Sequence, residues 1–280
     1  MITSHSYKIF LYVALPCEAK PLITYFQLKK DLNIQPFAIF GRDDLCLIVT
    51  GLGKTAMAAA IAYTQALFST ANPVLVNIGV AGHKDLAIGT LCLANKIVDV
   101  DSERCFYPPL VFKTDIPSYS VFTKAIPQLN YDHLALCDME ASAFYETAMR
   151  FTSSELVQCL KVVSDNALQP ADLIQAEQVS QLINKHCSVL AEFITQVTQL
   201  KIMLNQPELP LFDELSTQYH FTASAKAQLH SLLQRWSVLT DDQPLAIEGM
   251  TFKHSKDLLR WLEQQLYQAC FSILHTQKIG

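Results

Sequence analysis

Continuous apolar runs that end in a glycine or an acid constrain this chain more than any other feature. Residues 9–15 read Ile-Phe-Leu-Tyr-Val-Ala-Leu without alternation, and comparable runs occupy residues 45–50, 74–78 and 160–164. A strand covered on both faces in a parallel sheet needs such a run, whereas a strand with one wet face alternates. Helical patterns separate the runs, among them the alanine-rich residues 56–66. The order predicts an α/β fold with a mixed, mostly parallel central sheet flanked by helices.

The middle of the chain is less regular. Residues 91–100 predict a further strand or pair of strands, and residues 171–204 predict a long, mainly helical segment. Residues 101–132 contain four prolines and little periodicity. That composition predicts loop or edge structure between the regular elements.

The last quarter of the chain is predicted to be helical. Two prolines, Pro207 and Pro210, precede it, and residues 223–239 and 256–274 carry leucines at helical spacing. We therefore expect an α/β domain over residues 1–205 and a helical C-terminal extension over residues 206–280. Two amphipathic helices cannot bury their Leu and Trp faces alone, so we expect the extension to dock on the α/β domain or on another subunit.

Composition excludes several classes of protein. Half of the 280 residues are hydrophobic, 17% are charged and the net charge is −5, so we expect a folded chain and no nucleic-acid surface. No apolar run is long enough to span a bilayer. The eight cysteines include no Cys-x-x-Cys pair and no signal peptide is visible, which predicts reduced thiols in the cytoplasm. The eight histidines show no ligand spacing, so we predict no metal site.

Two acids mark a candidate site. Residues 134–151 have helical spacing, and Glu140 falls on their apolar face between Leu136 and Phe144. A glutamate is almost never fully buried unless a partner pairs with it. Asp165 follows the apolar run 160–164 directly, and ligands bind at the carboxyl ends of strands in open α/β sheets. We therefore expect both side chains in one binding site.

Other strand ends carry small residues or an acid. Glu18 is the first acid after the run 9–15, although a first-turn glutamate can simply favour the helix dipole. The turn at residues 51–54 is no phosphate loop, because Ile48 stands where that motif needs glycine. Its glycines either let backbone approach a ligand or allow tight strand-to-helix packing. His83, beside the small residues 79–82, is a lone histidine, which is more often structural than functional.

Four segments, in this order, resemble the purine nucleoside phosphorylase and nucleosidase superfamily, and Ser164-Asp-Asn166 closes the set. They are Ala14-Leu-Pro-Cys-Glu18, Gly51-Leu-Gly-Lys54, Asn77-Ile-Gly-Val-Ala-Gly82 and Asp138-Met-Glu-Ala141. The resemblance covers about residues 7–200. It is strongest to the hydrolytic branch, the methylthioadenosine/S-adenosylhomocysteine nucleosidases.

The resemblance implies a role for each matching residue. Asp165 would protonate the purine at N7, and Glu18 would position and deprotonate the attacking water. Glu140 would accept hydrogen bonds from two ribose hydroxyls, and Met139 would pack on the sugar. An acid on the leaving group and carboxylates facing a positive sugar suit the oxocarbenium-like transition state of glycosidic cleavage. The remaining pocket residues implied are Leu52, Val80, Ala81, Gly82 and Ser164, with Phe122 or Tyr119 stacking on the base.

The resemblance also implies a small-molecule nucleoside as partner and no cofactor. The apolar faces of the C-terminal helices predict a homodimer or a partner protein bound through them. Bacterial phosphorylases of the superfamily hold phosphate with an Arg at the position of Asn77, so water is favoured as the nucleophile. Val80 replaces the usual Ser or Thr, and the segment between Val100 and Asp138 is shortened, which leaves the nucleoside open. A phosphorylase and a non-catalytic descendant remain alternatives, but keeping all three acids favours catalysis.

Overall fold

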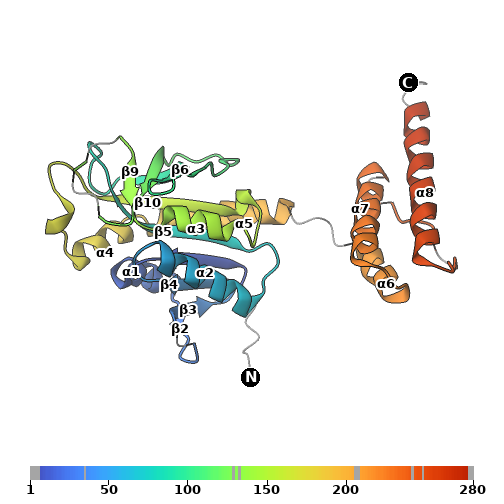
Figure 1. The fold of residues 1–280 in the computed structure, drawn as a ribbon, viewed down its shortest axis with the longest axis horizontal. Helices are drawn as coiled ribbons and strands as arrows, with labels where there is room; N and C mark the ends of the chain where they lie inside the picture. The colour runs from blue at the N-terminus through green and yellow to red at the C-terminus, as the bar shows by residue number, and fades with distance from the viewer. Residues whose placement is uncertain are drawn as a thin grey trace. The chain divides into compact units, whose positions relative to one another are not determined.

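The computed structural model describes residues 7–34, 36–127, 130–131, 134–204, 209–240, 243–247 and 249–276. The chain divides into two compact units, Met1–Leu204 and Asn205–Gly280. The first unit combines strands with helices and the second is helical (Figure 1). The boundary expected after residue 205 falls among residues 205–208, which lie outside the described residues.

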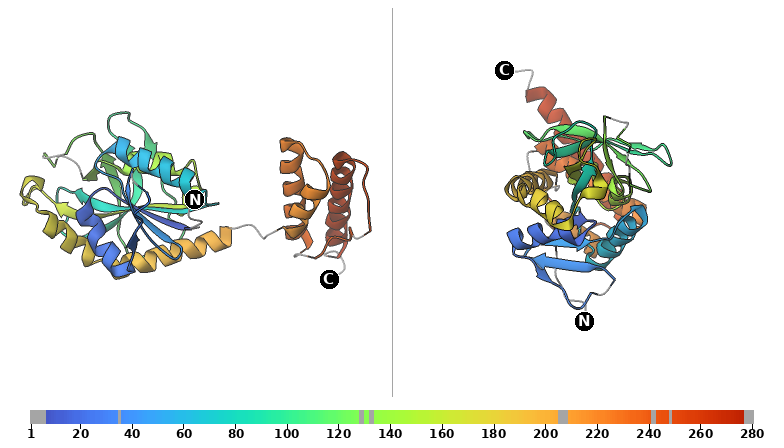
Figure 2. Two further views of the ribbon diagram at one scale, coloured as in Figure 1. Left: turned by 90° about the horizontal axis from the view of Figure 1, so that it is seen from below. Right: turned by 90° about the vertical axis from the view of Figure 1, so that its left-hand side faces the viewer.

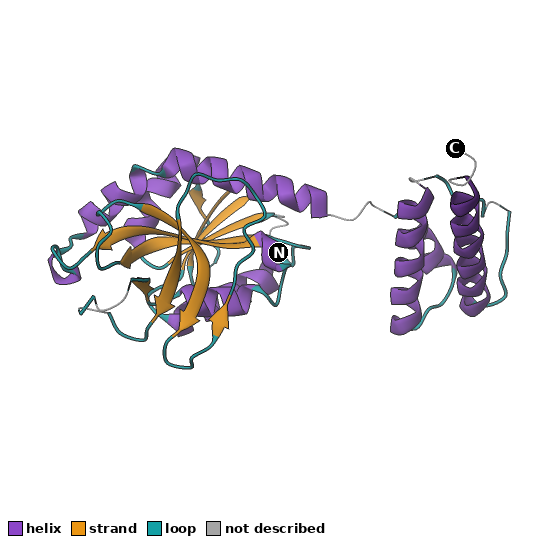
Figure 3. Ribbon diagram, turned by 90° about the horizontal axis from the view of Figure 1, so that it is seen from above, coloured by secondary structure: helices purple, strands orange, loops and turns teal. Residues whose placement is uncertain are grey.

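The strands of the first unit form one sheet that closes on itself at one end. They are β1 (Ile9–Val13), β2 (Lys29–Lys30), β3 (Ala38–Arg42), β4 (Leu45–Val49), β5 (Val74–Gly82), β6 (Leu91–Asp99), β7 (Cys105–Phe106), β8 (Ser118–Thr123), β9 (Leu136–Asp138) and β10 (Val157–Asp165). Strand β10 pairs with both β5 and β6, so β5, β10, β6, β8 and β9 make a closed ring. From β5 the sheet continues through β1 and β4 to β3 and β2, and Figure 3 shows the strands fanning out between helices.

The prediction of a mostly parallel sheet is confirmed only in part. Strand β1 runs parallel to β4 and β5, β10 runs parallel to β5, and β8 runs parallel to β6 and β9. Antiparallel pairs join β3 to β2 and β4, β6 to β7 and β10, and β5 to β9. The continuous apolar runs identify the parallel centre, because those strands are covered on both faces.

Helices cover both faces of this sheet. They are α1 (Pro16–Phe26), α2 (Lys54–Phe68), α3 (Ala141–Ala148), α4 (Ala176–Asn184) and α5 (Cys187–Leu204), with short 3-10 turns at Ser154–Leu156 and Ala171–Leu173. Helices α2 and α3 pack together on one face. Helices α1, α4 and α5 cover the other face, and Figure 2 shows α1 and α4 across the strands from α2.

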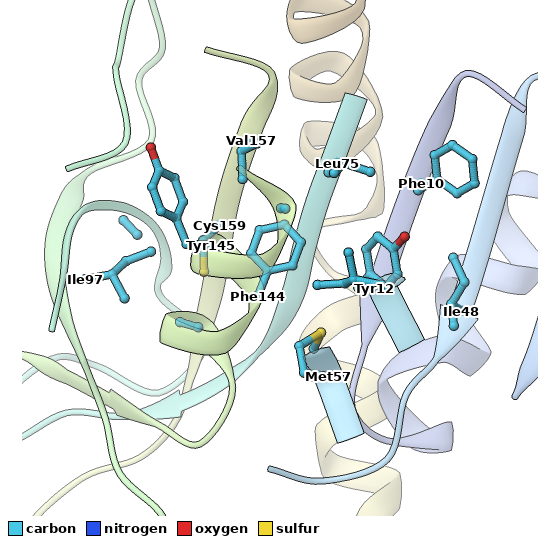
Figure 4. Packing of buried hydrophobic residues seen from close by; sticks show 14 of the residues in the cluster. Phe10, Tyr12, Ile48, Met57, Leu75, Ile97, Phe144, Tyr145, Val157 and Cys159 are labelled. Carbon is cyan, nitrogen blue, oxygen red and sulfur yellow. The ribbon is translucent and has the colours of Figure 1, made fainter. Parts of the chain in front are cut away.

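Strand β1 shows why its sequence does not alternate. Phe10 and Tyr12 point into the core under α2 and α3, whereas Leu11 and Val13 point into the core under α1 and α5. In Figure 4, Met57 of α2 and Phe144 of α3 approach Tyr12, whose ring centroid lies 5.9 Å from that of Phe144. Because both faces are dry, every position of the strand is apolar.

One central strand differs from the prediction. Residues 101–132 were expected to form loop or edge structure, yet β8 lies inside the ring between β6 and β9. Val121 and Thr123 of this strand are fully buried. Four of its six residues, Tyr119, Val121, Phe122 and Thr123, are types that favour strands, so the expectation of a loop rests on the surrounding prolines and not on the strand itself.

The second unit has a core of its own. It consists of α6 (Pro210–Gln218), α7 (Ala223–Thr240) and α8 (Ser255–Thr276). The leucines that were expected to need another surface bury one another instead, together with Leu215 of α6: they are Leu229, Leu232, Leu233, Leu258, Leu259, Leu262 and Leu266. Trp236 packs beside them, and its Nε1 donates a hydrogen bond to the backbone oxygen of Gln243 at 2.8 Å. Helix α6 and the segment between α7 and α8 therefore supply a cover for the two helices that the sequence had not indicated, while docking itself stays a prediction.

Among the described helices, none is both long and apolar enough to cross a membrane. The described residues also contain no group of His, Cys, Asp and Glu side chains arranged to hold a metal ion.

Candidate active site

A cavity of about 140 Å³ lies at the carboxyl ends of β1, β5 and β10. All but one of the predicted site residues line it: Glu18, Leu52, Val80, Ala81, Gly82, Met139, Glu140, Ser164 and Asp165. Phe122 is the exception, since it lies half-buried on β8 and is not among the residues of the cavity wall. The cavity opens toward solvent at Leu52, which is 58% exposed, and at the exposed Pro127.

Glu18 is held by backbone N–H groups. It lies in the first turn of α1 and is buried, and its Oε2 accepts hydrogen bonds from the N–H groups of Ala14 and Leu15 at 3.0 and 2.8 Å. Its Oε1 accepts one from the N–H of Val80 at 2.9 Å. Burial raises the pKa of Glu18, while these hydrogen bonds and the nearby Lys161 oppose that rise. Because Val80 contributes its backbone, this contact does not require the Ser or Thr that the resemblance leads one to expect.

Glu140 lies at the start of a helix and not on its face. The predicted helix over 134–151 is divided, because Leu136–Asp138 forms β9 and α3 begins at Ala141. Glu140 is the residue before α3, and its Oε1 accepts a hydrogen bond from the N–H of Gly53 at 2.7 Å. Gly51 and Gly53 have φ of 87° and 91°, a conformation that glycine adopts without strain. The glycine turn therefore holds a carboxylate of the candidate site.

A buried ion pair lies beneath the carboxylates. The Nζ of Lys161, on β10, is 2.8 Å from Oδ2 of Asp138, and both side chains are almost fully buried. Burial, the largest single cause, would lower the pKa of Lys161, but Asp138, Cys159 and Glu140 together outweigh it and the pKa is raised. Burial and the charge of Asp138 raise the pKa of Glu140 to about 7, and the charge of Lys161 opposes this rise. Lys161 therefore places one positive charge among the acidic side chains of Glu18, Asp138 and Glu140.

Gly79 lies close to Glu18 and to this cation. A Cβ at Gly79 would lie 3.0 Å from Oε1 of Glu18 and 3.4 Å from Nζ of Lys161. The first distance is tighter than most side-chain contacts, so a side chain at position 79 would press on Glu18, whereas the second is an ordinary contact. The small residues of β5 thus make room for the charged side chains around the cavity.

Asp165 receives two hydroxyl hydrogen bonds. It is the last residue of β10, and its Oδ1 accepts a hydrogen bond from Oγ of Ser164 at 2.5 Å. Its Oδ2 accepts one from the phenol of Tyr131 at 2.6 Å. Tyr131 belongs to the segment between β8 and β9, far from Asp165 along the chain.

Three residues of this site escaped the sequence prediction as functional positions: Lys161, Asp138 and Tyr131. Lys161 had a detectable signal, because a lysine inside an apolar run covered on both faces must find an acid. Asp138 was seen only as part of a motif, although its Oδ2 also accepts the N–H of Ala141 at 2.8 Å and so anchors α3. Tyr131 had no signal in the sequence, since its place depends on a tertiary contact.

The other polar residues near the site serve the fold. Asn77 is buried, and its Nδ2 donates to the backbone oxygen of Tyr12 at 3.0 Å. His83 accepts hydrogen bonds at Nδ1 from the N–H groups of Asp85 and Leu86, and burial lowers its pKa. The Tyr119 ring packs edge-on against His83 at 5.7 Å and does not line the cavity.

No protein-family model matches this sequence, and no curated protein matches it. Solved structures do match. The 5′-methylthioadenosine nucleosidase of Arabidopsis thaliana has 18% identity and a TM-score of 0.53 over 69% of this chain and 95% of its own. A variant of the Chlamydia trachomatis nucleosidase bound to methylthioadenosine (MTA) has 16% identity and a TM-score of 0.53 over 67% and 99% of the two chains. The Campylobacter jejuni 5′-methylthioadenosine/S-adenosylhomocysteine nucleosidase has 18% identity and a TM-score of 0.52 over 66% and 97%.

These solved chains are matched over nearly their whole length, whereas about a third of this chain has no counterpart in them. Identity at this level speaks for the fold. Over about two thirds of its length the chain has the fold of the methylthioadenosine/S-adenosylhomocysteine nucleosidases, which is the fold that the resemblance in its motifs implies.

Proposed function

We propose that this chain hydrolyses the N-glycosidic bond of a purine nucleoside of the adenine type. The observation that carries the proposal is that Glu18, Glu140 and Asp165 line one cavity although they come from three distant segments. The fold is shared with nucleosidases, one of which binds MTA. A protein that only binds a nucleoside has no need for three acids in these positions.

In the proposed reaction, Asp165 gives a proton to N7 of the base. The bond between C1′ and the base breaks, and its electron pair leaves with the base. A water molecule forms the new bond to C1′, and Glu18 takes its proton. Glu140 accepts hydrogen bonds from the ribose hydroxyls, and its negative charge favours the positive sugar of the transition state.

The cavity wall favours water over phosphate as the nucleophile. Of the described residues that line the cavity, none is Lys or Arg. A phosphate dianion is normally held by such cations. Lys161, beneath the wall, is already paired with Asp138. Hydrolysis is therefore the branch of the superfamily's chemistry that this site suits.

The cavity must widen when a nucleoside binds. Ligand pockets typically measure ~300–1,000 Å³, and this cavity is smaller. The exposed Leu52 and Pro127 at its mouth can move without disturbing the core. We expect the ribose at the Glu140 and Met139 side and the base near Asp165.

The test is to incubate the purified protein with a panel of nucleosides that includes MTA and adenosine, with and without phosphate. We expect free base at the same rate in both buffers, and free sugar as the second product. A sugar 1-phosphate among the products would show that the reaction is phosphorolysis and would contradict the proposed hydrolysis. Tight binding of a nucleoside without any release of base would show that the protein binds nucleosides and does not cleave them.

A further inference from the structure

The phenol of Tyr131 bridges Asp165 and the loop that follows β10. Its oxygen donates to Oδ2 of Asp165 at 2.6 Å and accepts a hydrogen bond from the N–H of Ala171 at 3.0 Å. The side chain is buried. Burial and the hydrogen bond to Asp165 raise the pKa of Tyr131, so the phenol keeps its proton and is the donor of this pair.

The Asp165 carboxyl is therefore fixed at both oxygens, by Tyr131 on one side and by Ser164 on the other. The pair also packs directly on β5. A Cβ at Gly82 would lie 2.5 Å from Oδ2 of Asp165 and 3.3 Å from Cε1 of Tyr131. The close approach of the two side chains to this strand thus depends on glycine, and the carboxyl has little freedom to turn.

The backbone of Tyr131 supports a specific role for this contact. Its φ of 42° lies in the left-handed region, which is unfavourable for a bulky residue. Such a conformation persists where surrounding contacts enforce it, and strained residues cluster at functional sites. The contacts seen here are the two hydrogen bonds of the phenol and the packing against Gly82.

We propose that Tyr131 is a positioning residue that orients the Asp165 carboxyl toward the leaving base. The inference rests on the proposed function. When Asp165 gives its proton to the base, it is left as a carboxylate. Hydrogen bonds to a charged acceptor are stronger than those to a neutral one, so the bonds from Tyr131 and Ser164 strengthen as the proton leaves. Stabilisation that grows toward the transition state accelerates the reaction without tightening substrate binding.

The test compares Tyr131→Phe with Tyr12→Phe. Both changes remove a buried, hydrogen-bonded phenol, but Tyr12 bonds to Thr64 and Gln65 in the core. With a nucleoside that the unaltered protein cleaves, we expect Tyr131→Phe to lower kcat about 10- to 100-fold and to leave KM nearly unchanged. Tyr12→Phe is expected to lower the melting temperature and keep kcat.

A second readout works without turnover. The ¹³C resonance of the Asp165 carboxyl, assigned through its loss in Asp165→Asn, is expected to shift in Tyr131→Phe and to stay in place in Tyr12→Phe. Unchanged or faster turnover of Tyr131→Phe would overturn the proposal, and faster turnover would mean that the phenol competes with the base. If the unaltered protein releases no base at all, the proposed hydrolysis fails, and an unshifted resonance would then separately refute the positioning role.

Discussion

At the scale of single residues, the site concentrates acidic groups that burial would normally exclude. Glu18 and Glu140 are almost completely buried, and their pKa values are raised mainly by that burial. Hydrogen bonds from backbone N–H groups, together with the charge of the buried Lys161, offset the free-energy cost of burying both carboxyl groups. Perturbed acids in a cavity are typical of functional sites, because the same burial that costs stability tunes proton transfer.

Asp165→Asn is expected to reduce kcat by about 10²–10⁴, because an amide cannot donate the proton that a general acid supplies. Substrate affinity should change little, since the amide can still bond the purine edge. Asp43→Asn on the β3–β4 turn is the matched control, because Asn accepts its φ of 50° well. If Asp165→Asn keeps full turnover and only loses melting temperature, the residue caps a turn and the proposed mechanism is wrong.

Glu140 should make nucleoside binding depend on pH. Its pKa is raised from 4.5 to about 7, and only the ionised form accepts both ribose hydrogen bonds. KM is therefore expected to fall by about tenfold between pH 6 and pH 8, as the ionised fraction rises. The stability of the folded state depends on pH in the opposite direction, because the folded protein holds the Glu140 proton more tightly than the unfolded chain does. This contribution to the free energy of unfolding is complete below pH 4.5 and is lost as the pH rises through 7. In Glu140→Gln, a higher KM that no longer varies with pH would support this, and a slope like that of the unaltered protein would contradict it.

At the scale of elements, the sequence reveals the strands that are buried on both faces, because such strands need a continuous apolar run. The strands β1, β4, β5 and β10 are recognisable because both of their faces are dry, and the acid at the end of β10 follows from that placement. Strand β8 is hidden by the prolines around it, although four of its six residues favour strands, and its pairing with β6 and β9 is a tertiary contact. The start of α3 is also hidden: helical spacing continues across β9. The boundary is set by hydrogen bonds from the first N–H groups of the helix to the side chains of Asp138 and Thr123.

Lys161→Met should test how β10 is tied to α3. The change leaves Asp138 as an unpaired buried charge, which typically costs ~3–5 kcal/mol. Asp138→Asn in the same chain removes that charge and is expected to restore part of the loss. Lys8→Met is the matched control, since the Lys8–Asp44 pair is half-exposed and such pairs contribute only ~0–1 kcal/mol. Urea denaturation measures the free energy of unfolding of the unaltered protein, the two single lysine variants and the double variant. A loss of stability in Lys161→Met no larger than that in Lys8→Met would count against a stabilising role of the ion pair.

At the scale of the whole molecule, the core of the second unit shares no residue with the two hydrophobic clusters of the first unit. The core of the second unit is formed by residues of α6, α7 and α8, together with residues just before α6, between α6 and α7, and between α7 and α8. A sequence pattern shows that a helix has an apolar face, but it does not show which surface covers that face. For this reason the extension could be recognised from the sequence while its internal packing could not.

This core makes a sharp prediction for the fragment 205–280. We expect the isolated fragment to be helical and to unfold cooperatively, because its buried leucines cover one another without help from elsewhere. Leu262→Ala should destabilise it by about 2–5 kcal/mol, the usual cost of a cavity at a buried leucine. Val238→Ala is the matched control, since Val238 lies on α7 with 78% of its surface exposed and should change stability by less than about 0.5 kcal/mol. Circular dichroism during urea denaturation measures both variants. A fragment that is unfolded or melts without cooperativity would mean that its core needs a further surface, and the docking expected from the amphipathic helices would regain its support.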